Sequence, residues 1–182
     1  MMNSWVGIPE SEQVSLDDRI AWMYNTRRDI QPMAGLNDTQ AAAVVRPGGN
    51  WRGPIRELGR FYEMLLAGGE SILKPETVTR FTSPQRIGMY DHTFRHDIDW
   101  GLGFNVDSNQ YGPNTVPYGY GRHASPAAFG HGGSQSSAGF ADPEHRLVVA
   151  IVCNGMLGEP KHQRRARELH TAIYEDLGLA TA

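Results

Sequence analysis

The sequence predicts an α/β fold of the α+β type, in which an antiparallel sheet carries a C-terminal helix packed on it. Strand-like segments follow one another over residues 127–153, and a helical pattern with apolar residues on one face closes the chain at 161–177. Strands in series followed by a terminal helix favour a helix laid on an antiparallel sheet. With 182 residues, 40% of them hydrophobic and 20% charged, the chain is long enough to bury a core.

The first 50 residues carry only weak periodicity. Residues 17–24 are the one modest helix candidate, and the segment ends in the turn-forming run Arg46–Asn50. We expect this segment to depend on neighbouring elements for its packing.

Two helices are expected in the middle of the chain. Over residues 53–69, apolar side chains recur at spacings of three and four, Pro54 suits the first helical position, and two glycines end the helix. A second, shorter helix is expected to begin with Pro75 in its first turn and to run through Phe81 to the stop at Ser83–Pro84.

Alternating patterns predict strands in the second half. Trp100–Val106 alternates large apolar residues with small or polar ones, which predicts a strand whose glycine face is closely covered. Three further strands are expected at 127–133, 136–141 and 146–153, with Asp142–His145 as the hairpin turn between the last two. The terminal helix is expected to end at Gly178 and to pack through one face formed by Ala166, Leu169, Ile173 and Leu177.

Charge and hydropathy exclude several functions. A formal net charge of −3 gives no electrostatic footprint for nucleic acid, and the longest apolar run, Leu147–Cys153, is far shorter than the roughly 20 residues of a membrane helix. We expect a soluble protein with no nucleic-acid or membrane partner, and the choice between cytoplasm and periplasm stays open. Cys153 is expected to be a buried structural thiol. The basic residues of the terminal helix are expected to form a solvated face: Lys161, Arg164, Arg165 and Arg167.

The most informative segment is the glycine-rich run Phe129–Phe140. A histidine followed by two glycines and several small residues leads into strand-like sequence, so a ligand could lie against bare backbone there. A G-x-S-x-G nucleophile elbow does not fit, because a serine occupies the last position and a strand follows. A self-contained triad of Ser134 or Ser136 with His131 and Asp142 is disfavoured, since neighbours on one strand rarely reach each other.

Acidic and histidine side chains gather between residues 91 and 99. They could be drawn as a metal site, but the segment is poor helix sequence and offers no clear third ligand at a diagnostic spacing. We interpret its histidines as solvated loop residues and expect no metal or other cofactor. The residues concerned are Asp91, His92, His96, Asp97 and Asp99.

The loop that contains Tyr118, Tyr120 and His123 allows two interpretations. Its aromatic and polar side chains could line a pocket, or it could be an exposed glycine-rich loop. The sequence leaves both open.

Ser71–Lys74 has the S-x-x-K spacing that places a serine and a lysine base on one helical face. Pro75 follows directly, and the residue before a proline is pushed out of the helical region. We therefore interpret this match as a decoy.

Five features stand in a fixed order along residues 46–177. They are Arg46–Asn50, the glycines Gly68–Gly69 that end a helix, Trp100–Phe104, Gly130–Ser134, and the Asp142–Pro143 turn before the closing helix. In this order and spacing they resemble the C-terminal part of the serine beta-lactamase and penicillin-binding-protein-like superfamily, especially its class C-like and esterase branches.

The resemblance implies the C-terminal part of a beta-lactamase/transpeptidase-like fold. Residues 1–50 would be a partly irregular remnant of its helical region, and residues 51–182 would contain the helix, loops, antiparallel strands and terminal helix of the C-terminal part. The family's Ser-x-x-Lys helix and its Tyr-x-Asn or Ser-x-Asn motif lie upstream of the parts matched here, and the sequence has no Tyr-x-Asn.

The resemblance also implies roles for residues. The family's Lys-Thr-Gly or His-Thr-Gly motif lies on the strand beside the active site, where His131 and its two glycines stand here, and the backbone N–H of Ser134 would form one arm of the oxyanion hole. His131 and Ser134 are thus the expected catalytic residues. A neutral histidine attracts an acidic substrate less than a lysine does, which favours ester or amide hydrolysis. The expected substrate-binding residues are Gly132, Gly133, Ser136, Tyr120 and His123.

We therefore expect a fragment or subunit of a serine hydrolase that acts through an acyl-enzyme and is inactive alone. Its expected partners are a small ester or amide substrate and the missing N-terminal portion of the same fold. The alternative is a non-catalytic module that binds a peptide or small ligand along the glycine-rich strand.

Overall fold

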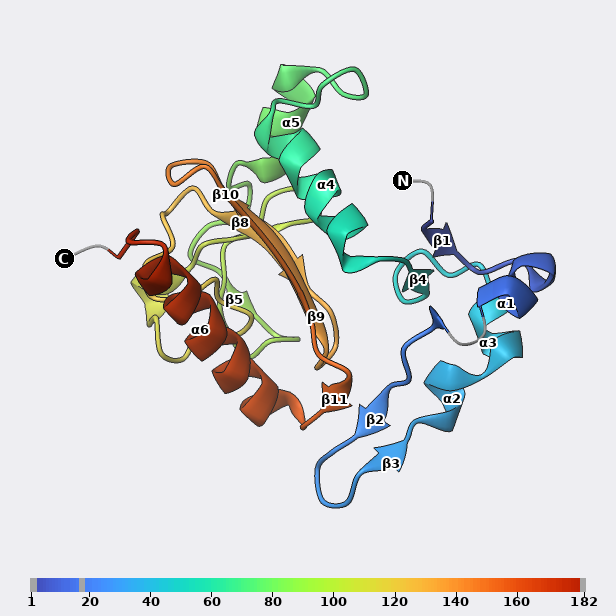
Figure 1. Cartoon of the computed structure of the whole chain (residues 1–182). Coiled ribbons are helices and arrows are strands. Elements are labelled where there is room, and N and C mark those ends of the chain that lie inside the picture. The colour runs from blue at the N-terminus through green and yellow to red at the C-terminus, as the bar shows by residue number, and fades with distance from the viewer. Residues whose placement is uncertain (1–2, 17–18, 181–182) are drawn as a thin grey trace.

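A computed structural model describes residues 3–16 and 19–180, and it is built around one curved antiparallel sheet (Figure 1). The sheet has the order β10-β9-β8-β7, with α4 against one face and α6 against the other. The helices are α1 (Glu10–Leu16), α2 (Ala34–Asn37), α3 (Thr39–Ala43), α4 (Ile55–Leu66), α5 (Pro75–Thr82) and α6 (Glu159–Asp176), with a 3-10 helix at Asn109–Tyr111. The strands are β1 (Trp5–Val6), β2 (Tyr24–Asn25), β3 (Gln31–Pro32), β4 (Trp51–Arg52), β5 (Tyr90–Asp91), β6 (His96–Asp97), β7 (Asn105–Val106), β8 (Phe129–Gly132), β9 (Ser137–Asp142), β10 (Leu147–Val152) and β11 (Gly155–Met156).

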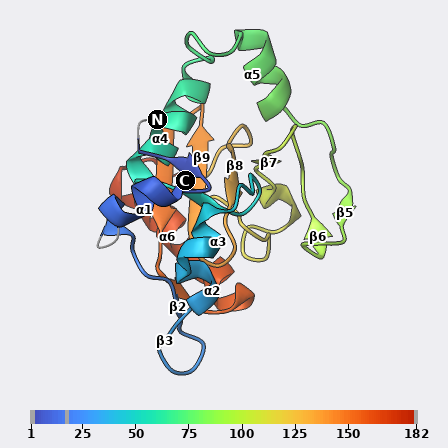
Figure 2. The same cartoon turned by 90° about the vertical axis from the view of Figure 1, so that its right-hand side faces the viewer.

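The α+β architecture predicted from the sequence is confirmed. The three expected strands form β8, β9 and β10, and the expected hairpin turn joins the last two. Arg146 takes a positive φ of 51° at the end of this turn. The N-terminal segment lies beside the sheet and is joined to it through α4, as Figure 2 shows from the side.

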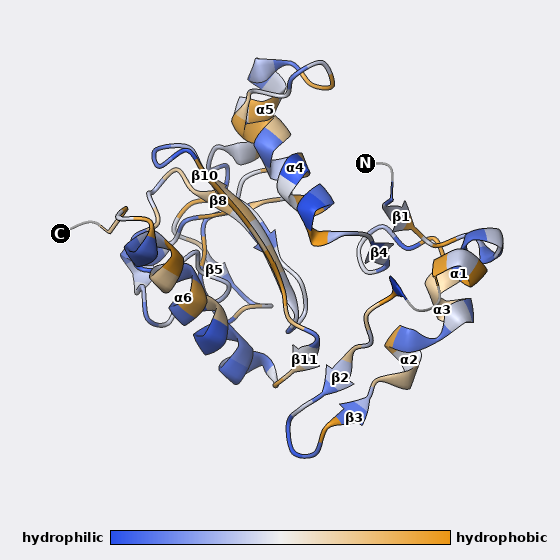
Figure 3. Cartoon of the chain, viewed as in Figure 1, coloured by the Kyte–Doolittle hydropathy of each residue, from blue (hydrophilic) through white to orange (hydrophobic). Residues whose placement is uncertain are grey.

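Each face of the sheet has its own hydrophobic cluster. On the α4 face, Tyr62 and Leu65 pack against Phe129 and Ala141. On the α6 face, Phe140 packs with Tyr174 of α6 and with Tyr120 of the loop before β8. The strands are accordingly hydrophobic along much of their length in Figure 3, because both of their faces are covered.

The two expected central helices are confirmed with small shifts at their ends. Pro54 is the N-cap of α4 rather than its first helical residue, and Gly68 and Gly69 end the helix with φ values of 77° and 96°. Pro75 opens α5, which ends at Thr82 before Ser83.

Two local predictions were wrong. The described helices of the N-terminal segment are α1, α2 and α3, and none of them lies at the expected 17–24 position, where Tyr24 belongs to strand β2; residues 17 and 18 lie outside the described residues. The expected strand Trp100–Val106 is regular only over β7, because Gly103 takes a φ of 88°. The close covering of its glycines is found at Gly101, where an added Cβ would collide with the Phe81 carbonyl.

The packing face of α6 also differs from the prediction. Leu169 and Leu177 are exposed, and the buried stripe runs through His162, Ala166, His170 and Tyr174 at intervals of four. His170 can be buried because its Nδ1 bonds the Gly119 carbonyl at 3.0 Å.

The expected solvated basic face holds for only part of α6. Arg165 and Arg167 are half-buried and donate to backbone carbonyls, including those of Gln135 and Val116. Cys153 is half-buried rather than buried. No helix among the described residues is long and apolar enough to span a membrane.

Candidate active site

The neighbours of strand β8 pack so closely against its glycines that no side chain would fit at these positions. A Cβ on Gly130 would collide with the backbone of Gly139 and Phe140, and one on Gly132 would collide with the Tyr118 ring. Both positions therefore require glycine, and the space beside them is filled by the protein itself, by the Tyr118 ring at Gly132 and by Gly139 and Phe140 at Gly130.

His131 lies on the α4 face of the sheet. Side chains alternate along a strand, so His131 shares the face of Phe129, which packs against α4. Directly opposite on β9 stands Gly139, and the Tyr62 ring fills the space that a side chain there would occupy. The imidazole is exposed, and its Nδ1 lies 2.7 Å from the Gly132 carbonyl.

The turn after β8, residues 133–136, presents an unpartnered donor. The Gly133 N–H donates to Ser137 at 2.7 Å and the Ser136 N–H donates to Gly133 at 3.5 Å. Gln135 has a φ of 52°, whereas Ser134 is not among the residues with positive φ. Ser134 is exposed, and in the described part of the chain its N–H has no hydrogen-bond partner. The N–H is thus free to donate to a ligand.

The N-terminal end of α6 fixes this turn. Gln135 is buried, and its Oε1 accepts the Gly158 N–H at 2.7 Å. Arg165 donates from Nη2 to the Gln135 carbonyl at 3.2 Å. Tyr118, whose ring covers Gly132, donates to Glu159 at 2.7 Å, and burial together with this hydrogen bond raises the pKa of Tyr118.

Trp100 is the aromatic neighbour of His131, with ring centroids 5.9 Å apart. Its Nε1 donates to Asp91 at 3.2 Å, and the Arg86 guanidinium lies over its ring and also bonds Asp91. Burial raises the pKa of Asp91, but the hydrogen bonds from Arg86 and from the Phe94 and Thr93 N–H groups lower it by more. The pKa therefore lies below its ordinary value, and the carboxyl stays ionised. This network orients Trp100 beside His131.

Asp99, at the other end of the acidic segment 91–99, also has a structural role. Asp99 is buried and accepts from Gln110 at 3.0 Å, from Tyr111 at 3.0 Å and from the Gly88 N–H at 2.9 Å. Its carboxylate is thus occupied by protein donors, as that of Asp91 is.

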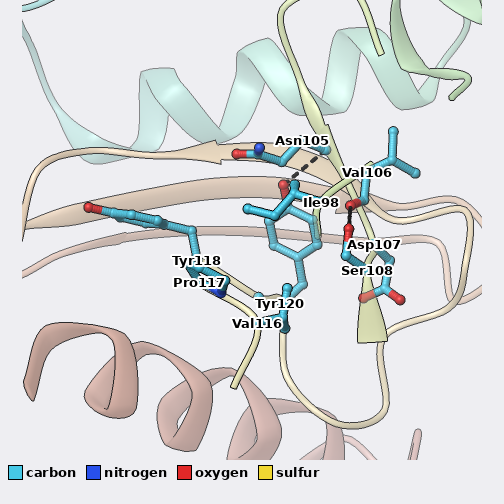
Figure 4. Close-up of a pocket in the computed structure, with 10 residues that line it drawn as sticks. Ile98, Asn105, Val106, Asp107, Ser108, Val116, Pro117, Tyr118 and Tyr120 are labelled. Carbon is cyan, nitrogen blue, oxygen red and sulfur yellow. Dashed lines mark hydrogen bonds between the residues drawn. The ribbon is translucent and has the colours of Figure 1, made fainter. Parts of the chain in front are cut away.

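Two residues expected to bind substrate lie away from His131. Tyr120 is 2% exposed, stacks on Phe140 on the α6 face and donates to the Asn105 carbonyl at 3.0 Å (Figure 4). It is therefore on the opposite face from His131. His123 lies 3.5 Å from Glu175. Glu175 lies near the C-terminal end of α6, whereas the 133–136 turn contacts the N-terminal end of this helix. At a rise of 1.5 Å per residue the two ends are about 24 Å apart, so His123 is far from the turn.

The loop before β8 is therefore neither an open pocket nor an exposed loop. Its residues 116–121 are buried or half-buried, whereas Arg122, Pro126 and Ala127 are exposed, and the cavity that the loop lines has a volume of about 10 Å³, the space of about one water molecule (Figure 4). Asp107 lines this cavity, and burial together with the nearby Asp142 and Asp99 raises its pKa to about 7, against the bond from the Asn109 N–H.

The disfavoured triad is excluded by the position of Asp142. This carboxylate is fully buried at the far end of β9 and accepts from Ser125 at 2.6 Å, from Tyr174 at 2.7 Å and from His145 at 2.9 Å. Burial raises the pKa of Asp142, but these hydrogen bonds outweigh it and the pKa lies below its ordinary value. Its hydrogen bonds fix the turn after β9 and the end of α6.

The decoy interpretation of Ser71–Lys74 agrees with the structure. Lys74 is extended, with φ −77° and ψ 146°, and α5 begins only at Pro75. Ser71 and Lys74 therefore do not share a helical face.

Sequence reasoning missed Trp100, Gln135 and Arg165 as neighbours of the candidate site. Trp100 stood in a recognised pattern and was interpreted only as part of a strand. The contact of Arg165 with Gln135 spans 30 positions, and no local pattern signals it.

Comparisons with known proteins identify the family. The family model described as Beta-lactamase matches residues 4–173. Among solved structures, a penicillin-binding protein homologue from Caulobacter crescentus is 27% identical, with a TM-score of 0.64 over 92% of this chain and 48% of that chain. EstA from Arthrobacter nitroguajacolicus Rue61a shares the fold at 22% identity, with a TM-score of 0.68 over 98% of this chain and 51% of that chain.

A third structure, EstCE1, described as a hydrolase with promiscuous acyltransferase activity, has a TM-score of 0.65 at 18% identity over 90% of this chain and 46% of that chain. The chain thus spans about half the length of these structures. No curated protein shows significant similarity to it. The family model covers nearly the whole sequence, and the chain therefore belongs to the Beta-lactamase family, within the serine beta-lactamase and penicillin-binding-protein-like superfamily.

Proposed function

We propose that this chain forms one wall of the active site of a serine hydrolase that cleaves small esters or amides through an acyl-enzyme. The observation that carries the proposal is the unpartnered Ser134 N–H, held by a fixed turn next to the exposed His131. The Beta-lactamase family match supports the reaction class.

In this mechanism a base takes the proton of a serine hydroxyl as its Oγ attacks the substrate carbonyl carbon, and the carbonyl oxygen becomes an oxyanion. The Ser134 N–H donates to that oxyanion, and His131 offers a further hydrogen bond to the substrate. Collapse of the tetrahedral species breaks the bond to the alcohol or amine, which leaves with the proton taken from the serine, and water then hydrolyses the acyl-serine to the carboxylic acid and free serine. Removing one oxyanion donor typically costs about 3 to 4 kcal/mol of transition-state stabilisation.

We also propose that the nucleophile and its base come from polypeptide outside these 182 residues, so that the chain alone is inactive. Two observations support this: Ser71 and Lys74 do not share a helical face, and the chain spans about half of its structural relatives. The non-catalytic binding module is not favoured, because the chain matches the Beta-lactamase family model and the similar structures include one described as a hydrolase.

The test uses the chain alone and the chain mixed with the part of the Caulobacter crescentus homologue that it does not cover. The chain alone is expected to keep its mass after treatment with a fluorophosphonate. The mixture is expected to hydrolyse a p-nitrophenyl ester with a burst of acyl-enzyme. Labelling of Ser134 or Ser136 in the isolated chain would contradict the proposed source of the nucleophile, and hydrolysis without a burst would contradict the acyl-enzyme.

The role of the Ser134 N–H has a matched pair of variants. Ser134 occupies the second position of a turn whose third residue, Gln135, has positive φ, and proline is common at that second position in type II turns. Ser134→Pro therefore removes the donor and keeps the turn, whereas Ser134→Ala keeps the donor. We expect kcat to fall by about 10²- to 10³-fold in the proline variant only. Equal rates for the two variants would refute this role.

A further inference from the structure

A cavity in the N-terminal segment is formed by α1, α2, α3, strand β4 and the chain that leads into β2, at the right of Figure 1. Its volume is about 60 Å³, room for a few water-sized groups. None of its described lining residues belongs to strand β8 or to the 133–136 turn, so the cavity is not part of the candidate active site. What it could hold follows from the charge and polarity of its lining.

Arg52 of β4 brings an unpaired cation to this cavity. The residue is half-buried, and its Nη2 donates to the Leu36 carbonyl at 2.7 Å, a neutral partner. Its Nε is buried and, within residues 3–16 and 19–180, has no hydrogen-bond partner, and no carboxylate in the same ranges forms an ion pair with the guanidinium. Burial lowers the pKa of Arg52, but an arginine keeps its charge in proteins. A cation withdrawn from water without a counter-charge is costly, so Arg52 is expected to take an anion.

The amide side chains of the cavity are used within the protein. The Asn37 Oδ1 accepts the Met23 N–H at 3.0 Å, and its Nδ2 donates to the Met23 carbonyl at 3.1 Å. The Gln13 Nε2 donates to the Ile8 carbonyl at 2.9 Å. The Arg52 Nε, in contrast to these amide groups, is left for a ligand.

The rest of the lining selects the kind of anion. Ile20, Leu36 and Ala42 give the cavity apolar walls that would cover a short hydrocarbon chain. Asp38 also lines the cavity, and its Oδ1 accepts the Ala41 N–H at 2.7 Å. This carboxylate would repel a second negative charge on the ligand. The lining therefore favours a singly charged anion with an apolar body over a dianion such as sulfate.

We propose that the cavity at Arg52 binds a small aliphatic carboxylate, of which acetate is a simple representative. The planar guanidinium matches the two oxygens of a carboxylate, and the alkyl part would pack against Ile20, Leu36 and Ala42. With only a few non-hydrogen atoms, acetate also suits the volume of the cavity. This site does not depend on the proposed hydrolysis, because its residues take no part in that reaction.

The test uses the whole chain, sodium acetate as the probe, and sodium sulfate at matched ionic strength as the comparison anion. NMR follows the Arg52 Nε–H and the Trp22 indole N–H, because both side chains line the cavity. We expect both signals to shift along a saturable curve with acetate. Sulfate is expected to bind about tenfold more weakly, because the Asp38 carboxylate repels its second charge.

Two arginine-to-lysine variants test the guanidinium itself. Arg52→Lys keeps the positive charge and removes the planar set of donors. Arg56→Lys makes the same change at an exposed arginine of α4 and serves as the control. Acetate affinity, measured from the Trp22 signal, is expected to fall about tenfold in Arg52→Lys and to stay unchanged in the control. Acetate should also raise the urea midpoint of the parent chain and the control but not of Arg52→Lys, since a ligand stabilises the folded chain that binds it.

Three results would overturn the proposal. They are a shift that grows linearly with acetate and does not saturate, equal affinity for acetate and sulfate, which would indicate a general anion site, and unchanged acetate affinity in Arg52→Lys. Circular dichroism checks the fold of each variant. If Arg52→Lys unfolds, the saturation and the anion preference of the parent chain decide the question.

Discussion

Two buried groups give this fold opposing pH dependences, which single substitutions should separate. Asp107 is 9% exposed, and burial beside Asp142 and Asp99 raises its pKa from 3.8 to about 7. The unfolded chain loses this proton near pH 3.8, whereas the folded chain keeps it until about pH 7. The stability contributed by this group therefore decreases as pH rises across that window. At 1.36 kcal/mol per pKa unit, the decrease is about 4 kcal/mol.

His170 acts in the opposite direction. It is 2% exposed, and burial together with the nearby His162 lowers its pKa from 6.5 to about 4, against the bond to the Gly119 carbonyl. Below pH 6.5 the unfolded chain gains a proton that the folded chain does not, so stability decreases as pH falls towards 4, by about 3 kcal/mol. Between about pH 4 and 6.5 the two contributions nearly cancel.

The assay is urea unfolding at half-unit pH steps from 4 to 8, with the free energy of unfolding of each variant compared with that of the parent chain. Asp107→Asn is expected to gain stability relative to the parent as pH rises, reaching about 4 kcal/mol above pH 7. His170→Gln is expected to gain relative stability as pH falls from 6.5 to 4. A difference between variant and parent that stays constant with pH would refute the reasoning for that residue.

Two further substitutions test the packing of the site and of the sheet. Gly132→Ala forces a Cβ against the Tyr118 ring and should lower the free energy of unfolding by about 1 to 3 kcal/mol, whereas Gly35→Ala, with open space around it, should cost nothing in the same urea assay. Tyr174→Phe removes the 2.7 Å donor to Asp142 and should cost about 1.5 to 3 kcal/mol at pH 7, and an unchanged urea midpoint would contradict the assigned hydrogen bond.

Local patterns were enough to predict most of the sheet and the helix α4. In α4 the apolar spacing, Pro54 and the paired glycines all favour the same element. The packing face of α6 could not be predicted, because His162 and His170 are polar by type and become core residues only through distant partners. His170 bonds Gly119, which lies 51 positions away.

The residues of the candidate site were likewise predictable from the sequence only in part. The glycines of β8 predicted a close approach to this strand, and the group that approaches Gly132 is the Tyr118 ring of the same chain. The sequence could not place Tyr120, because an aromatic loop beside glycines can line a pocket or be buried, and the covering helix α6 decides between these outcomes. It could not predict Gln135 either, whose role depends on Gly158 and on a left-handed turn.

The α6 face of β8 is closed and supported, whereas the α4 face at His131 and the edge at β10 are open. These open features are two strands apart, about 10 Å, with β9 between them. They are nevertheless joined, because the Cys153 N–H just beyond β10 donates at 2.7 Å to Ser136 of the turn that carries Ser134, and residues in one hydrogen-bond network do not act additively in free energy. The turn that presents the Ser134 N–H is therefore bonded both to the end of β10 and to the N-terminal end of α6, and loss of either support is expected to act on the same donor that Ser134→Pro removes.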